Sequence, residues 1–237
     1  MEEKLNGIVL GGVNFGDNDK ILNVFTLEQG VVSAKIKGVK KAGAKLKFAA
    51  EPFCFAEFIF ATKGKFRTVT GASLIDSFYS LREDLFKYYC GATVLEYLKK
   101  FCREGIVSRE IFLLSVESLK KIAYGDNPQS DICLFLINAL KISGYALNLE
   151  GCFTCNKEIE GRIFFDYVYG GFFCEHCQTA DCREINYSTY LALKKINGGE
   201  TLSSAECVGA LRLLDYYLLN KTEEKLNSLK ELISLTQ

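Results

Sequence analysis

Two Cys-x-x-Cys pairs constrain what this chain of 237 residues can fold into more than any other feature of its sequence. Cys152 and Cys155 form the first pair, Cys174 and Cys177 form the second, and residues 156–173 separate them. This spacing is typical of a zinc ribbon, in which two short knuckles hold one tetrahedral Zn²⁺ and a hairpin joins them. The sequence therefore predicts one Zn²⁺ bound by these four thiolates.

The chain between the two pairs supports the hairpin. The segment 162–174, RIFFDYVYGGFFC, has apolar residues in strand-like runs and is interrupted at Gly170 and Gly171, immediately before the second pair. Four thiolates complete the coordination of zinc and leave no position for water, so we expect a structural metal. Cys182 ranks as a distant fifth candidate ligand, and His176 is either a solvated neighbour or an occasional substitute ligand.

The sequence predicts a cytoplasmic protein. Its first ten residues, MEEKLNGIVL, place acidic groups where a secretion signal needs a basic segment followed by an apolar one. No run approaches the ~18 to 20 apolar residues of a membrane-spanning helix. A reducing compartment favours zinc over disulfides, and it lets the other cysteines act as small buried hydrophobic residues. These cysteines are Cys54, Cys90, Cys102, Cys133 and Cys207.

Basic residues are concentrated in one region, although the 29 Lys and Arg residues balance the 29 Asp and Glu residues of the whole chain. Between positions 35 and 67 only Glu51 and Glu57 are acidic. Such a patch favours a polyanionic partner, because neutralising phosphates releases condensed counterions. The alternative is a solvated loop whose lysines keep the domain soluble. The candidate phosphate-contacting residues are Lys35, Lys37, Lys40, Lys41, Lys45, Lys47, Lys63, Lys65 and Arg67.

Residues 1–80 have the pattern of a small β-domain. Five short apolar or alternating segments, at 5–15, 20–29, 31–39, 53–62 and 66–75, are separated by turn residues and fit a closed barrel, with the OB-fold as the leading candidate. Segment 38–48 is expected to be a flexible, lysine-rich connection. Period-two spacing assigns four phenylalanines to the core and leaves two as surface rings for base stacking. The core set is Phe53, Phe55, Phe58 and Phe60, and the surface set is Phe48 and Phe66.

From residue 81 onward the pattern is helical, so we expect a helical domain at 81–237 with the zinc ribbon inserted at about 150–182. The fold class is therefore α+β with more than one domain. Acidic pairs at 83–84 and 223–224 are expected to cap helix starts. The helical segments are 81–105, 108–125, 128–151, 186–197, 203–221 and 223–235. In the first of them, one apolar stripe is predicted from Leu85, Tyr88, Tyr89, Ala92, Leu95, Leu98 and Cys102.

The sequence argues against enzymatic chemistry. Its one histidine, His176, lies between two predicted metal ligands, which leaves no free base for a Ser-His-Asp or Cys-His system. Segment 38–45, GVKKAGAK, imitates a phosphate-binding loop but lacks the required Gly-Lys followed by Ser or Thr. Three classes remain: a nucleic-acid-binding protein without turnover, a zinc-containing protein-interaction scaffold, and a zinc-dependent enzyme.

Four segments together carry a family resemblance: residues 6–41, NGIVLGGVNFGDNDKILNVFTLEQGVVSAKIKGVKK; residues 73–85, SLIDSFYSLREDL; CFTC at 152–155; and YGGFFCEHC at 169–177. In this order they resemble the RecO family of bacterial recombination mediators over essentially the whole chain. The resemblance implies an N-terminal OB-fold, a helical C-terminal domain and, as in many members, an inserted four-Cys zinc site. Two positions depart from the family pattern, with Gly11 where Arg is common and Lys40-Lys41 where Arg-Arg is frequent.

The same resemblance implies a function and partners. Members bind single- and double-stranded DNA, anneal complementary strands and work with RecR, often RecF, and single-strand binding protein to load RecA. We therefore expect a non-enzymatic, cytoplasmic and nucleoid-associated DNA repair mediator, whose basic barrel residues contact DNA. Its C-terminal helices are expected to accept the acidic tail of single-strand binding protein. A protein-interaction scaffold without direct DNA binding is the alternative.

Overall fold

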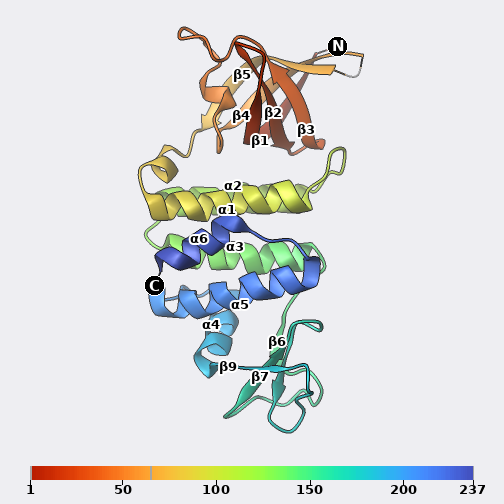
Figure 1. Cartoon of the computed structure of the whole chain (residues 1–237), viewed down its shortest axis with the longest axis vertical. Coiled ribbons are helices and arrows are strands. Elements are labelled where there is room, and N and C mark those ends of the chain that lie inside the picture. Colours follow the sequence, from red (N-terminus) through yellow and green to blue (C-terminus); the bar gives the residue numbers. More distant parts are fainter. Residues whose placement is uncertain (1, 65, 237) are drawn as a thin grey trace. The chain divides into compact units, whose positions relative to one another are not determined.

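The computed structural model describes residues 2–64 and 66–236 and divides the chain into two compact units, Met1–Tyr124 and Gly125–Gln237. The first unit contains a β-barrel and two helices, and the second contains four helices and a small sheet (Figure 1). The barrel and its first two helices thus form one unit by their contacts. The boundary after residue 80 that the sequence suggested stays a prediction.

The five predicted strands of the first unit close into a barrel, which confirms the α+β fold with an N-terminal OB-type barrel. The strand order is β1-β2-β3-β5-β4, and the pairing of β3 with β5 is parallel while the other pairings are antiparallel. Because β1 also pairs with β4, the closed sheet has no free edge. The strands are β1 (Glu2–Phe15), β2 (Asp19–Thr26), β3 (Gly30–Ile36), β4 (Phe55–Lys63) and β5 (Phe66–Asp76).

Alternating residues of the strands fill the barrel. Phe58 and Phe60 are fully buried and their rings stack 5.8 Å apart, as their period-two spacing predicted. Phe53 is also buried, but it precedes β4 with φ of 70° and therefore does not belong to the strand's alternation. Phe48 packs against the barrel core, so its assignment to the surface was wrong. The ring of Phe66 is 81% exposed.

A short 3-10 helix, η1 (Phe48–Ala50), precedes β4, and three helical elements follow the barrel strands in the first unit: η2 (Tyr79–Arg82), α1 (Leu85–Phe101) and α2 (Arg109–Tyr124). The predicted capping role of Asp84 is confirmed, because its carboxylate accepts a hydrogen bond from the Lys87 amide at 2.8 Å. The predicted stripe of α1 is only partly correct. Leu95 and Leu98 are buried, but Leu85 and Tyr88 at the start of the helix are exposed.

Helix α1 buries a wider surface than one stripe. Thr93, Val94 and Tyr97 are buried together with Leu95 and Leu98, so contacts cover more than one side of its second half. A prediction that assumes one apolar stripe therefore misidentifies which residues of α1 are buried. Phe55, assigned to the barrel interior, is half-buried, and its ring lies 6.1 Å from Phe112 of α2.

The second unit has four helices and, as predicted, a small sheet inserted between two of them in the chain. The helices are α3 (Pro128–Ile142), α4 (Tyr187–Asn197), α5 (Ser204–Thr222) and α6 (Asn227–Leu235). The sheet has the order β6-β8-β7-β9 and lies between α3 and α4 in the chain. Its strands are β6 (Asn148–Cys152), β7 (Ile163–Asp166), β8 (Gly171–Cys174) and β9 (Arg183–Ile185). The expected capping role of Glu223 at a helix start was wrong, because Glu223 follows α5 with φ of 60°.

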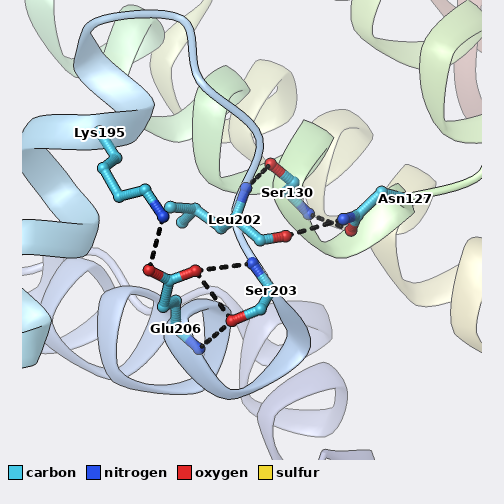
Figure 2. A network of polar contacts seen from close by, with 6 residues as sticks. All are labelled: Asn127, Ser130, Lys195, Leu202, Ser203 and Glu206. Atoms are coloured by element: carbon cyan, nitrogen blue, oxygen red, sulfur yellow. Dashed lines mark hydrogen bonds and ion pairs between the residues drawn. The ribbon is translucent and has the colours of Figure 1, made fainter.

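A polar network fixes the loop before α5 (Figure 2). The Ser203 hydroxyl accepts the amide of Glu206, and the Glu206 carboxylate accepts the amide of Ser203 at 2.8 Å, which forms a capping box. Lys195 of α4 donates to the same carboxylate at 2.8 Å. The neighbouring Leu202 amide donates to the Ser130 hydroxyl of α3 at 3.0 Å. One short segment thus joins three helices.

None of the helices in the described part of the chain combines the length and the apolar character needed to cross a membrane.

We predict a pH-dependent loss of stability on replacing Glu206. The hydrogen bond from Lys195, followed by those from Ser203, lowers the pKa of Glu206 from 4.5 to about 2. The carboxylate therefore stabilises the fold fully above pH 4.5 and progressively less as the pH falls towards 2. Glu206→Gln should lower the free energy of unfolding at neutral pH by about 1 kcal/mol, the usual size of a helix-cap contribution. Urea titrations at several pH values measure this.

Glu200→Gln is the matched control, because Glu200 is exposed in the same loop. It should leave the urea midpoint nearly unchanged. A deficit of Glu206→Gln that stays constant from neutral pH down to pH 2 contradicts the role given to the carboxylate.

Candidate metal centre and basic loop

The four predicted cysteine ligands converge in the second unit. The sulfur atoms of Cys152, Cys155, Cys174 and Cys177 all lie within 4.8 Å of one another. Zn–S bonds of about 2.3 Å in a tetrahedron place sulfur atoms about 3.8 Å apart, so the group has the dimensions of a four-thiolate site. Within residues 2–64 and 66–236, this is the one group of three or more Cys, His, Asp or Glu residues that converges in this way.

The sheet positions both pairs. Cys152 ends β6 and Cys174 ends β8, and these two strands are parallel neighbours, so both knuckles begin at the same end of the sheet. The Asn156 amide donates to the Cys152 carbonyl at 2.8 Å, and the Cys177 amide donates to the Cys174 carbonyl at 3.1 Å. Each Cys-x-x-Cys segment is therefore closed into a tight turn.

The predicted hairpin joins the knuckles. β7 and β8 pair antiparallel, and the Asp166 carboxylate at their turn accepts the amides of Val168 at 2.7 Å and Tyr169 at 3.0 Å. Gly170 follows with φ of 66°, and a Cβ atom there would lie 2.5 Å from the hydroxyl oxygen of Tyr217 on α5. Only glycine fits this turn, because both the backbone conformation and the neighbouring ring exclude a side chain.

The electrostatics of the four thiols favour a bound cation. Burial alone would raise the pKa of Cys152, but the amides of Cys155 and Cys174, with that of Thr154, outweigh it and lower the pKa to about 6. Hydrogen bonding to Cys174 and then burial raise the pKa of Cys177. One thiolate thus suppresses ionisation of its neighbour, whereas a metal ion that binds all four sulfur atoms favours the deprotonated form of each.

Cys182 and His176 lie outside this group. Cys182 is buried against Phe164 and Phe173, and its sulfur accepts the Thr179 amide at 3.5 Å, so it packs and does not converge with the four. His176 is exposed to solvent.

The remaining cysteines are mostly core residues. Cys54, Cys90, Cys133 and Cys207 are buried, and Cys102 is half-buried. Burial raises the pKa of Cys54 to about 11 and that of Cys102 to about 12, which keeps both thiols protonated at neutral pH.

The predicted basic connection is a hydrogen-bonded loop between β3 and β4. We call residues 37–47 the basic loop. Its amides form a succession of turns, with Lys41 donating to Gly38 at 3.1 Å and Ala44 donating to Lys41 at 3.1 Å. The Lys40 amide also donates to the Asn18 carbonyl at 3.0 Å. Backbone hydrogen bonds thus give the loop a defined course, while its flexibility stays a prediction. Its lysines Lys37, Lys40, Lys41, Lys45 and Lys47 are exposed.

Asp19 holds the root of the basic loop, and the sequence did not identify this role. Its carboxylate accepts the Gly38 amide at 2.8 Å and pairs with the Lys35 ammonium at 2.7 Å. These two hydrogen bonds, with that from Lys35 the larger, lower the pKa of Asp19. The Lys35 nitrogen also lies 4.4 Å from the ring centroid of Phe15. Lys35 is therefore part of the barrel framework as well as of the predicted phosphate-contacting set.

Arg67 is likewise engaged inside the protein. It donates to the Gln29 side-chain oxygen at 2.8 Å and pairs with Glu3 at 3.7 Å, while Gln29 also donates to Glu3 at 2.8 Å. This network joins β1, the β2–β3 turn and β5. The exposed lysines of the basic loop have no such partners among the described residues.

The structure separates the basic residues into two groups. Lys63 pairs with Phe66 at the tip of the β4–β5 hairpin, whereas the basic loop leaves β3 after Ile36, which pairs with Val69. Phe66 and Val69 are three residues apart on β5, so at about 3.3 Å per residue the hairpin tip lies about 10 Å from the start of the basic loop. Because β3 is parallel to β5, it runs away from the tip. Lys65 lies outside the described residues.

A further cation near the barrel was not identified from the sequence. A Cβ atom on Gly11, at the bulge of β1, would lie 3.5 Å from the ammonium nitrogen of Lys99 on α1. A helix therefore places a lysine over a strand position that has no side chain of its own. No sequence signal pointed to it, because the two residues are far apart in the chain.

Comparison with known proteins gives two family matches and several relatives. Residues 1–78 match the model "Recombination protein O N terminal" and residues 82–230 match "Recombination protein O C terminal". Proteins named "DNA repair protein RecO" are similar to this chain. That of Desulforamulus reducens is 31% identical over 186 residues, covering 78% of this chain and 72% of the relative. That of Caldicellulosiruptor saccharolyticus is 28% identical, with 77% and 75% covered. That of Bacillus pumilus is 29% identical, with 75% and 69% covered.

We predict that Cys174→Ser removes the metal from the purified protein. The wild type should contain about one equivalent of a thiophilic metal ion, and the variant should have lost at least half of it, because a hydroxyl replaces one of four thiolates. The second unit should also be destabilised, while the barrel remains folded. Metal analysis and limited proteolysis measure the two effects.

Cys182→Ser is the matched control and should retain the metal. Unchanged metal content in Cys174→Ser, or a disulfide between the two pairs, contradicts the assignment.

We also predict that Asp19→Asn loosens the basic loop. The neutral amide weakens the acceptance of the Gly38 amide and removes the ion pair with Lys35, so the amides of residues 38–47 should exchange with solvent severalfold faster. Because the pKa of Asp19 is lowered, the wild-type loop should hold above the ordinary pKa of an aspartate and loosen only as the pH falls through the lowered value. Hydrogen exchange read by mass spectrometry measures this.

Asp17→Asn, an exposed change in the same β1–β2 turn, serves as the control. If the amides of residues 38–47 exchange equally fast in both variants, Asp19 does not anchor the loop.

Proposed function

This chain belongs to the RecO family of DNA repair proteins, and from that membership and its basic loop we propose that it is a DNA-binding recombination mediator without enzymatic turnover. The observation that carries the proposal is the set of exposed lysines on a hydrogen-bonded loop at the end of a closed barrel. Lys37, Lys40 and Lys41 follow β3 directly, at the position where Asp19 fixes the backbone. Because the backbone of the loop is already hydrogen-bonded, less backbone freedom is lost when its lysines meet phosphate.

The chemistry of the loop supports binding to the DNA backbone. Ammonium groups are point charges that contact phosphates without reading base edges, so recognition is independent of sequence. Such a surface accepts single- and double-stranded DNA alike. Neutralising the phosphates of two complementary strands also lowers their mutual repulsion, which supports strand annealing.

We further propose the partners that family membership suggests. The protein works with RecR, and with RecF where that partner is used, to help load RecA onto DNA coated by single-strand binding protein. The acidic tail of single-strand binding protein is proposed to dock on the helices of the second unit. The protein acts in the cytoplasm, associated with the nucleoid.

The metal proposed for the four-cysteine group is Zn²⁺ in a structural role. Thiolates favour Zn²⁺ among the abundant divalent ions, and four of them leave no position for a reacting water. The ion would hold the two knuckles together and supply no chemistry. This supports the absence of turnover.

A zinc-containing interaction scaffold is the competing reading, in which the lysines only solubilise the loop. A zinc-dependent enzyme is a third reading. DNA binding that weakens steeply with salt would distinguish the DNA-binding mediator from the scaffold, because only phosphate contacts release counterions. Turnover that disappears when the metal is removed would support the enzyme.

We predict that replacing both Lys40 and Lys41 with Ala weakens DNA binding. Two phosphate contacts are lost, so the slope of log K against log salt should fall by about 1.8 for duplex DNA and about 1.4 for single strands. The loss should be similar for unrelated sequences, annealing should slow, and the metal content should not change. Fluorescence anisotropy at two or more salt concentrations measures the slope.

Lys120→Ala with Lys157→Ala removes the same charge from exposed positions elsewhere and should leave the slope near that of the wild type. If the loop variant binds as tightly as the wild type at low and moderate salt, the basic loop is only a solvated connection.

A further inference from the structure

A groove in the second unit lies between β9, the start of α4 and the middle of α5. Its larger part has a volume of about 650 Å³ and is lined by Tyr167, Arg183, Asn186, Arg212 and Tyr216, among others. A smaller hollow of about 290 Å³ continues it along α4 and α5 and shares Asn186 and Arg212. The two hollows therefore form one elongated groove with Arg212 at its middle.

Two arginines and two glutamates line the groove, and among the described residues only the glutamates have ion-pair partners. Arg183 and Arg212 are exposed, and neither guanidinium has a hydrogen bond or ion pair with any residue that the structure describes. Glu184 lines the same wall, but its carboxylate accepts two hydrogen bonds from Arg162, at 2.9 and 2.7 Å. Glu206, at the far end, is paired with Lys195 (Figure 2). Both carboxylates are thus neutralised by other cations, and the two arginines face the groove uncompensated.

Aromatic rings lie beside these arginines. The rings of Tyr167 and Tyr216 meet edge to face with centroids 4.7 Å apart, and Tyr216 keeps 53% of its surface exposed. Arg212 and Tyr216 are four residues apart on α5, so they are neighbours on one helix face, with Cβ atoms about 5–6 Å apart. The Asn186 side chain adds an amide, because it makes no capping hydrogen bond at the start of α4.

We propose that this groove binds single-stranded DNA, with Arg183 and Arg212 contacting phosphates and Tyr216 stacking on a base. The inference rests on the proposed DNA-binding function and adds a second contact surface to it. Cations alternating with exposed rings are the arrangement that single-strand binding uses, and a guanidinium fits phosphate with two parallel hydrogen bonds. One nucleotide spans the distance between neighbouring side chains on a helix face, with its phosphate at Arg212 and its base at Tyr216.

An acidic peptide is the other ligand that would use these arginines. Its carboxylates would pair with the arginines, but such a peptide has no need of the exposed ring of Tyr216, one helical turn from Arg212. A duplex is also disfavoured, because its bases are stacked and cannot reach Tyr216. The proposal therefore predicts a preference of this groove for single strands.

The first test replaces Arg183 and Arg212 with Ala in the full chain. The probe is a fluorescein-labelled oligothymidylate of about 30 nucleotides, longer than the about 4 to 16 that one barrel occupies. We expect the slope of log K against log salt to fall by about 1.4, for two lost contacts, while duplex binding changes less. Arg103→Ala with Arg109→Ala removes two exposed arginines elsewhere and should leave the slope unchanged.

The second test concerns the ring. Tyr216→Ala should weaken single-strand binding about fivefold or more, whereas Tyr216→Phe should keep the wild-type affinity, because it keeps the stacking face. An oligonucleotide with 5-iododeoxyuridine should cross-link to Tyr216 on irradiation, and mass spectrometry locates the adduct. Unchanged metal content and circular dichroism show that each variant is folded.

The outcomes distinguish this proposal from the function on which it rests. If Lys40→Ala with Lys41→Ala weakens binding but the arginine pair does not, the groove proposal fails and the DNA-binding function stands. If the arginine pair abolishes capture of an aspartate-rich peptide but leaves oligothymidylate binding unchanged, the groove is a peptide site. If the wild type binds no oligonucleotide at low salt, both proposals fail.

Discussion

The convergence of four sulfur atoms brings together the ends of two strands, β6 and β8, and the turns that follow them in the second unit. One face of the small sheet buries only a small cluster, Phe164, Phe173 and Cys182. On the other face, Phe165 packs against Tyr217 of α5 and Phe172 packs against Tyr190 of α4. Small elements with so little core on one face are commonly held by a metal or covalent crosslink, and the zinc proposed above would serve here. The edge strand β9 pairs with β7 over three residues, so its position follows from that of the β7–β8 hairpin. The proposed zinc site would therefore also help to fix the wall of the groove that carries Arg183.

In the first unit, the basic residues divide into two kinds. Some form ion pairs that hold the barrel together, and others are exposed without an ion pair among the described residues. Lys35 and Arg67 are held by Asp19 and Glu3, where they join strands and a turn. The exposed lysines of the basic loop then extend from a backbone that Asp19 holds through the Gly38 amide. Acidic residues thus do not cancel the charge of the loop. They select which cations remain available to a ligand.

Features with a local pattern were predictable from the sequence. The Cys-x-x-Cys spacing identified the four-sulfur group, and the short alternating segments identified the barrel strands. The contacts that Arg67 makes inside the protein were not predictable, because its partners Gln29 and Glu3 come from another strand and a turn. The buried faces of α1 were misjudged for a similar reason, since packing on more than one side overrides a single amphipathic stripe. The groove at Arg212 likewise combines segments that are separated in the chain.

The contact between Gly170 and Tyr217 bears on whether the ribbon is a transferable module. The hairpin turn fits against the tyrosine hydroxyl, which itself donates to the Tyr145 carbonyl at 3.2 Å after α3. Lys221 of α5 donates to the Val168 carbonyl in the same turn. A ribbon grafted into another host would lose these supports, and a chain shortened by excising it would expose the aromatic face of α5. Ribbon and helices have thus become structurally interdependent, although the ribbon is an insertion in the chain.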